Sequence, residues 1–248
     1  MDLGLTGRGY LVTGGTKGLG FASAQALVGE GARVLVSSRS EQGVRDATTA
    51  LGTGASGLVG DNADPSAAAR LVDRAGAEFG RLDGLLVSVG GPPKLPFADT
   101  SDDQWRAAFE SVTLGAVRLI RAAVPVMTDG GAIALVLSSS VRTPIPGLSL
   151  SNALRPGLAM LVKELADELG PNGIRVLALV PGRILTERTI TTDGADPDAR
   201  RRSEATIPLR RLGTPEEFGR VAAFALSPAA SYMTGSTVTI DGGMVRGI

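Results

Sequence analysis

The chain of 248 residues is long enough for one large domain, and 43% hydrophobic residues supply a sizeable core although only 4% are aromatic. Its 25 Lys and Arg balance 25 Asp and Glu, so zero net charge offers no bulk positive field for nucleic acid or an acidic membrane. The absence of Cys excludes disulfides and thiolate catalysis, and the absence of His removes the commonest general base and metal ligand. Most hydrolase triads and zinc enzymes are thereby excluded, and no metal site is expected.

Short apolar runs alternate with segments of helical periodicity along the whole chain. In order, the predicted elements are a strand at 10–12, a helix at 18–28, a strand at 34–36, a helix at 41–51, a strand at 58–59, a helix at 65–79, a strand at 82–89, a helix at 102–127, a strand at 133–137, a helix at 150–169, and strands at 174–180 and 237–240. Apolar residues recur every three or four positions over 102–127, which is typical of one helix face. The polar stretch at 191–204 is expected to be a mobile surface insert.

Strands that are apolar on both faces and separated by helices predict a parallel sheet covered on both sides. With right-handed crossovers this is an α/β fold, a Rossmann-type doubly wound parallel sheet of about seven strands, in a single domain over residues 1–248. Ligand sites in such sheets lie beyond the carboxyl ends of the strands. No stretch approaches the roughly 20 apolar residues of a membrane span, and the chain start lacks signal-peptide features. The expected compartment is the cytoplasm.

A glycine-rich loop, Thr13-Gly14-Gly15-Thr16-Lys17-Gly18-Leu19-Gly20, joins the first strand to the first helix. Gly14 permits a tight turn, Gly18 lets the backbone approach a pyrophosphate, and Gly20 allows the helix to pack closely on the strand. The phosphates would lie at the helix N-terminus. A lone glycine pattern can also be an ordinary turn, but the strand–loop–helix setting favours a dinucleotide site.

The end of the second strand indicates which dinucleotide is bound. NAD sites usually place a carboxylate there, against the adenosine ribose hydroxyls, but this strand ends Ser37-Ser38-Arg39. Arg39, together with Lys17 in the glycine loop, has the charge to pair with a 2′-phosphate. NADP (NADPH) is therefore favoured over NAD, with two solvated surface cations as the alternative.

Further motifs follow the later strands in a fixed order. They are Gly60-Asp61-Asn62, Gly90-Gly91, Ser138, Pro181-Gly182-Arg183-Ile184-Leu185-Thr186, and the ending Thr234-Gly235-Ser236 to Asp241-Gly242-Gly243. With the glycine loop, this set resembles the short-chain dehydrogenase/reductase family across essentially the whole chain. The resemblance implies contacts of Asp61 and Asn62 with the adenine, of 88–90 with the adenosine side, and of 181–186 with the nicotinamide carboxamide. The cofactor-binding residues expected are Gly14, Thr16, Lys17, Gly18, Leu19, Gly20, Ser38, Arg39, Asp61, Asn62, Ser88, Val89, Gly90, Pro181, Gly182, Ile184 and Thr186.

The same resemblance implies a catalytic tetrad of Asn, Ser, Tyr and Lys, of which this sequence keeps one member. Ser138 matches the family serine. The Tyr position, thirteen residues later, is Ser151, and the Lys position is Arg155, so YxxxK has become SxxxR. The Asn position is Val112, on the apolar helix face, where a core side chain is expected.

These replacements change the chemistry that the site can perform. A Ser hydroxyl is a far weaker acid than a Tyr phenol, whose reference pKa is about 10, and an Arg guanidinium keeps its proton. Arg155 can still hold ribose hydroxyls and place positive charge beside a developing alkoxide, while Ser138 and Ser151 hydrogen-bond a carbonyl oxygen. Lys94 is the nearby side chain with a movable proton, and a solvated loop lysine is its alternative reading.

Two functions fit these observations. The first is an NADP-dependent oxidoreductase of this type acting on a carbonyl or alcohol, with a proton relay altered to run through Ser151, Arg155, water or Lys94. The second is a catalytically silent NADP(H)-binding sensor or partner subunit, suggested by an intact cofactor loop beside an altered tetrad. The retained Ser138 and the cation at the Lys position favour the enzyme.

The substrate and the assembly are less defined by the sequence. Arg142 and Arg183 are expected to point into the pocket and, with Lys94 and Arg155, to favour an anionic or polarised small molecule. The segment from about 184 to 207 is expected to be a substrate lid. The resemblance implies a homo-tetramer, with a dimer as the alternative, and no nucleic-acid or membrane partner is expected.

Overall fold

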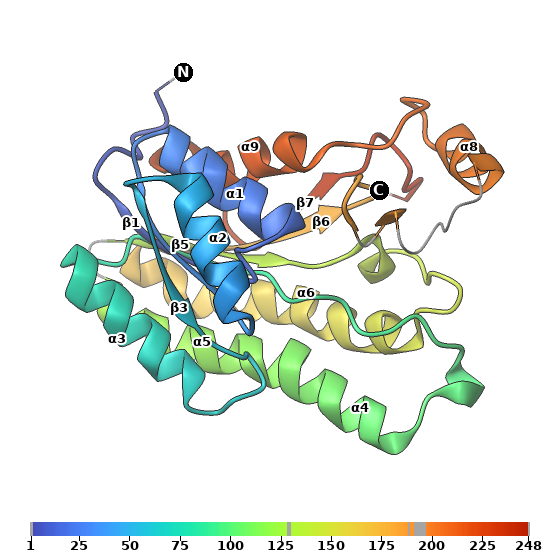
Figure 1. The fold of residues 1–248 in the computed structure, drawn as a ribbon, viewed down its shortest axis with the longest axis horizontal. Helices are drawn as coiled ribbons and strands as arrows, with labels where there is room; N and C mark the ends of the chain where they lie inside the picture. The colour runs from blue at the N-terminus through green and yellow to red at the C-terminus, as the bar shows by residue number, and fades with distance from the viewer. Residues whose placement is uncertain (1, 128–129, 188, 191–196, 248) are drawn as a thin grey trace.

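The structure is a computed structural model that describes residues 2–127, 130–187, 189–190 and 197–247. Within these ranges, seven parallel strands form one sheet in the order β3-β2-β1-β4-β5-β6-β7 (Figure 1). The strands are β1 (Gly9–Thr13), β2 (Arg33–Ser38), β3 (Ala55–Val59), β4 (Gly84–Val87), β5 (Gly131–Val136), β6 (Ile174–Pro181) and β7 (Ser236–Ile240). The single-domain, doubly wound parallel sheet expected from the sequence is confirmed.

Helices cover both faces of the sheet (Figure 1). One face carries α1 (Gly18–Gly29), α2 (Glu41–Leu51) and α9 (Pro215–Leu226). The other carries α3 (Ala67–Phe79), α4 (Asp102–Ala108), α5 (Gly115–Ala123) and α6 (Ser149–Leu169). A further helix, α8 (Pro197–Thr206), lies apart from both layers. No helix in the described ranges is both long and apolar enough to cross a membrane.

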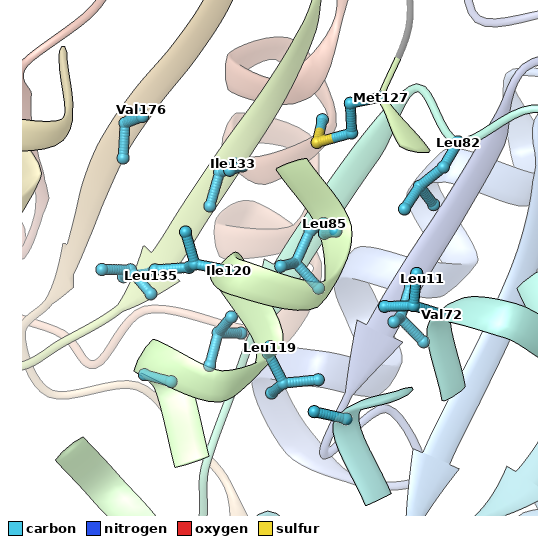
Figure 2. Close-up of a cluster of buried hydrophobic side chains, with 14 of the residues drawn as sticks. Leu11, Val72, Leu82, Leu85, Leu119, Ile120, Met127, Ile133, Leu135 and Val176 are labelled. Atoms are coloured by element: carbon cyan, nitrogen blue, oxygen red, sulfur yellow. The ribbon is translucent and has the colours of Figure 1, made fainter. Parts of the chain in front are cut away.

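The core consists of two apolar clusters, one on each face of the sheet. Alternate strand residues point to opposite faces, so Leu11 joins the cluster under α3, α5 and α6, whereas Tyr10 and Val12 join the cluster under α1 and α9. Figure 2 shows part of the first cluster, in which Leu119 and Ile120 of α5 lie against Leu85 and Ile133 of the sheet. Burial on both faces explains why the strands read as continuous apolar runs.

The helix expected over 102–127 is interrupted. α4 passes into a π-helical turn, Phe109–Leu114, before α5 begins, and a 3-10 turn, Val124–Val126, follows. The apolar residues still face the sheet, and Val112 within the π-helical turn is only 3% exposed. The periodicity therefore predicted the buried face correctly but not the local change of helical pitch. Pro156 lies inside α6 without ending it.

A buried carboxylate fastens the amino-terminal edge of the sheet. Asp83 is 4% exposed and accepts hydrogen bonds from Arg8 Nη1 at 2.7 Å, Arg81 Nε at 2.6 Å and the Gly9 amide at 2.9 Å. Burial by itself raises the pKa of Asp83, but the hydrogen bonds from Arg81 and Gly9 and the charges of Arg81 and Arg8 outweigh it and hold the pKa below its usual range. The ionised carboxylate thereby joins the starts of β1 and β4.

We expect Asp83→Asn to lower the free energy of unfolding at pH 7 by about 2 kcal/mol, because charge-assisted bonds are lost in a buried position. A carboxyl whose pKa is depressed in the folded state stabilises the protein fully above its unfolded-state pKa, about 3.9 for Asp. That contribution disappears as the pH falls further, through the folded-state pKa. Urea unfolding between pH 7 and pH 3 should therefore show the variant and the parent protein converging.

The matched control is Asp73→Asn, which changes an exposed carboxylate on α3 and should leave stability unchanged. A stability loss for Asp83→Asn that stayed the same at every pH would contradict the assignment to the ionised carboxylate.

Candidate functional site

A cleft of about 1680 Å³ runs along the carboxyl edge of the sheet. Its lining comes from the loops after β1 to β6, from α4, α6 and α8, and from the C-terminal residues 244–247. The chain leaves β1 toward β2 on one side, and β4 continues toward β5 on the other, so the loops diverge at this switch point. All twenty residues proposed from the sequence as cofactor-binding or catalytic line this one cleft.

The glycine loop has the backbone that close approach to a ligand requires. Gly14 and Gly18 have φ of +58° and +52°, a region that side-chain-bearing residues rarely adopt. A Cβ on Gly20 would lie 2.2 Å from the Gly14 carbonyl oxygen, so helix α1 could not pack here with a larger residue. The first amides of α1 face the cleft with the positive end of the helix dipole. This cradle fits a pyrophosphate.

The end of β1 is fixed to the end of β4. Thr13 Oγ1 accepts from the Ser88 amide and donates to the Ser88 carbonyl oxygen, both at 3.2 Å. Two residues further on, Gly90 has no atom within 4 Å of the place where a Cβ would stand, so its surroundings are open. The first and fourth strand ends therefore form one rigid rim of the cleft, where the adenosine side of a dinucleotide is expected.

The two cations proposed for a 2′-phosphate differ in their partners. Arg39 is exposed and lines the cleft, and no ion pair engages it in the part of the chain that the structure describes. Lys17 is paired instead with Glu187, at 3.0 Å across the cleft mouth, and both side chains are exposed. Asp61, after β3, accepts from the Ala63 amide at 3.0 Å and so holds a tight turn. Arg39 is thus the better placed of the two cations proposed for a 2′-phosphate.

The segment after β6 closes the cleft at its other end. Gly182 donates its amide to the Ile240 carbonyl oxygen at 2.9 Å, and a Cβ on it would lie 2.5 Å from Asp241 Cβ. Ile184 is 4% exposed and pairs with Gly213 in an isolated bridge. Of the lid expected over 184–207, positions 188 and 191–196 lie outside the described residues. The described remainder includes α8, from which Ala199, Arg202, Ser203 and Thr206 line the cleft.

Three serines form a network where the family tyrosine is expected. Ser138 follows β5, and its Oγ accepts from the Ser140 amide at 3.1 Å, in a short 3-10 turn. Ser151, in the first turn of α6, has its Oγ 3.1 Å from Ser140 Oγ. Ser140 and Ser151 are each 5% exposed. Asn152 anchors this part of α6, because its side-chain amide makes two bonds to the backbone of Ile145.

Arg155 is held by the sheet. It lies four residues after Ser151 on the same face of α6, is 6% exposed, and donates Nη1 to the carbonyl oxygens of Val136 and Leu137 at 2.7 and 3.0 Å. The guanidinium is therefore held at the carboxyl end of β5, and Arg155 lines the cleft together with Ser138 and Ser151. Its reach toward ribose hydroxyls, expected from the sequence, is constrained by these two bonds.

The space between Arg155 and the π-helical turn is small and apolar. A void of about 10 Å³ is lined there by Val112 and by other apolar side chains apart from Arg155. That volume is at the lower limit for a single water, which also needs two or more polar partners. Val112, which the sequence resemblance places at the Asn position of the family, is thus a buried core residue.

Other sequence-based expectations are met unevenly. Lys94 and Arg183 line the cleft, and Lys94 is exposed. Arg142 was expected to point into the pocket, which is wrong, because it is exposed at the end of the 3-10 turn and is not part of the lining. Ser140 and Arg246 were not expected at the site. The signal for Ser140 was its place in a run of three serines, and Arg246 comes from the C-terminal segment that lines the cleft.

Comparison with known proteins identifies the family. A family model described as enoyl-(acyl carrier protein) reductase matches residues 14–245. Oxidoreductase AsL5 of Sarocladium schorii is 34% identical over 98% of this chain and 97% of its own. A solved short-chain dehydrogenase/reductase family protein superposes with a TM-score of 0.89 at 32% identity over 98% and 99% of the two chains. L-Sorbose reductase of Gluconobacter frateurii, solved with NADPH and L-sorbose, superposes with a TM-score of 0.94 at 29% identity over 100% of both chains. The chain therefore belongs to the short-chain dehydrogenase/reductase family of oxidoreductases.

Proposed function

We propose that this protein is an NADP(H)-dependent oxidoreductase that interconverts a carbonyl compound and its alcohol in the cleft at the carboxyl edge of the sheet. The observation that carries the proposal is the meeting of the glycine cradle, Arg39 and the hydroxyls of Ser138 and Ser151 in one continuous cleft. Bound NADPH would supply the hydride. The residues proposed from the sequence as cofactor contacts keep those roles here.

The preference for NADP rests on charge. The end of β2, Ser37-Ser38-Arg39, carries no carboxylate, and the exposed Arg39 has the charge that a 2′-phosphate would need. The related L-sorbose reductase was solved with NADPH, which supports the same choice.

The chain's own groups bind and polarise the substrate oxygen. Ser138 and Ser151 donate hydrogen bonds to it, and Arg155 places a fixed charge in the same cleft, which stabilises the negative charge that develops on that oxygen. Neither hydroxyl is acidic enough to replace a phenol as proton donor. The final proton comes from water in the cleft or from Lys94, which is the non-standard part of the proposed relay.

A silent NADP(H)-binding protein is the second candidate. It is favoured by the bonds that hold Arg155 on the strand carbonyls and by the closed, apolar space at Val112. Cofactor binding without turnover would support it.

A homo-tetramer is proposed from the family resemblance, built through α4 to α6 and β7. Exposed apolar side chains on α6 and on the turns that flank α5 support this assembly, since Phe109, Val126 and Met160 are 44%, 40% and 72% exposed.

The primary test is oxidation of NADPH, followed by the loss of its absorbance, with a panel of β-keto esters, diketones and quinones. We expect turnover with at least one carbonyl compound, and Ser138→Ala should lower kcat about tenfold or more, because it removes a donor to the developing oxyanion. Binding of NADPH measured by fluorescence should be unaffected. Tight binding with no oxidation of NADPH by any compound would favour the silent candidate.

The cofactor preference is tested by Arg39→Asp. We expect the Kd of NADPH to rise about tenfold or more while that of NADH changes little, because only the 2′-phosphate loses a charge-assisted partner. Arg45→Asp is the control, since it changes the net charge equally on α2 but lies outside the cleft lining. An equal loss of affinity for NADPH and NADH would exclude Arg39 as the ligand of the 2′-phosphate.

The source of the proton is tested by the pH profile of kcat. If water protonates the alkoxide, the rate should stay level from pH 6 to 10, because neither serine hydroxyl titrates there. If Lys94 is the donor, Lys94→Met should remove most of the activity, whereas the same substitution should leave kcat nearly unchanged if water is the donor.

A further inference from the structure

Ser140 lies behind Ser151 and does not reach the cleft. Both serines are 5% exposed, but Ser151 is part of the cleft lining and Ser140 is not. The two hydroxyl oxygens are 3.1 Å apart, and geometry alone permits either to donate. The site of the family tyrosine is thus occupied by a pair of hydroxyls, one facing the cleft and one buried.

We infer that Ser140 is the donor in this hydrogen bond, because a buried hydroxyl hydrogen needs an acceptor. Among the described residues, Ser151 Oγ is the hydrogen-bond partner recorded for the Ser140 hydroxyl, so a Ser140 hydrogen pointed elsewhere would be buried without an acceptor, which is costly. Ser151 has an alternative acceptor in whatever oxygen occupies the cleft. Donation from Ser140 to Ser151 therefore leaves the Ser151 hydrogen directed into the cleft.

The hydroxyl hydrogen of Ser138 is also left free to point into the cleft. Ser138 Oγ accepts the Ser140 amide at 3.1 Å, so one of its lone pairs is occupied on the protein side and its own hydrogen is left for the cleft. Ser140 thus acts on both hydroxyls, through its amide on Ser138 and through its side chain on Ser151. A hydroxyl that accepts a hydrogen bond also becomes a stronger donor.

We propose that Ser140 is a positioning residue that, by donating to Ser151 and Ser138, makes their hydroxyls a two-donor site for the oxygen anion of the reduced substrate. This inference rests on the proposed oxidoreductase function. In the reductive direction the carbonyl carbon would receive hydride from NADPH, which would leave as NADP+, and the π electron pair moves to the oxygen. The anion is held by the two hydroxyls until a water molecule donates a proton, which gives the alcohol and a hydroxide ion released to solvent. Ser140 neither touches the substrate nor loses its proton in this sequence.

The test is a double-mutant cycle on kcat with the best carbonyl substrate, using Ser140→Ala, Ser151→Ala and the double variant. Ser140→Ala should lower kcat about fivefold, the effect of one neutral hydrogen bond, with KM and the Kd of NADPH unchanged. In the Ser151→Ala background the same substitution should have no further effect, because the hydroxyl it orients is absent. Ser140→Thr, which keeps the hydroxyl, should retain most of the activity.

Controls separate positioning from a general loss of structure. Ser227→Ala removes another buried seryl hydroxyl, bonded to the Phe224 carbonyl oxygen at 2.7 Å at the end of α9, and should lower Tm without changing kcat. If Ser140→Ala does not fold, Ser140→Cys takes its place in the cycle, because its slightly larger thiol fills the space of the hydroxyl while being a weaker hydrogen-bond donor.

The outcomes distinguish this inference from the function on which it rests. Equal effects of Ser140→Ala in both backgrounds, or an unchanged kcat, would overturn the positioning role while leaving an active oxidoreductase. Absence of NADPH oxidation in the parent protein with every carbonyl compound would overturn the proposed function and this inference with it.

Discussion

The parallel pairing of β1 with β4 is the constraint on which the site depends. Tyr10 pairs with Gly84, and at the other end of β1 Thr13 Oγ1 bonds both the amide and the carbonyl group of Ser88. The chain departs from this pair in opposite directions, so the loops after β1 and β4 separate and leave a cleft between them. Because all the strands are parallel, every loop with a functional residue arrives at the same edge.

The end of the cleft proposed to be catalytic combines a buried guanidinium with the hydroxyl groups of serines. A buried guanidinium needs hydrogen-bond partners, and Arg155 finds them in the carbonyl groups at the end of β5. A lysine amine at this position could turn between the sheet and a ligand, whereas a planar guanidinium bonded to two carbonyl oxygens is held in one orientation. The arrangement is therefore suited to stabilising charge in place, and less to passing protons.

Most of the fold and the cofactor side of the cleft could be predicted from residue pattern. Gly14 and Gly18 have the positive φ angles, +58° and +52°, that the loop pattern predicts, and Val112 is buried as its position on the helix indicated. The prediction failed where local geometry changes without a compositional signal. The apolar period continues through the π-helical turn 109–114, and the 3-10 turn after Ser138 carries Arg142 outward. Neither departure alters hydrophobicity or uses a glycine or proline that would mark it.

The parallel sheet and the glycine cradle follow from residue types at a fixed spacing, and so does the expectation that Ser151 and Arg155 stand at the tyrosine and lysine positions of the family. Only the tertiary structure decided that Ser140, among three consecutive serines, meets Ser151, and that Arg155 bonds to β5. These contacts join residues 11 and 19 positions apart. They depend on how the turn after β5 directs its side chains and how α6 docks on the sheet, which are properties of packing and carry no periodic signal in the chain.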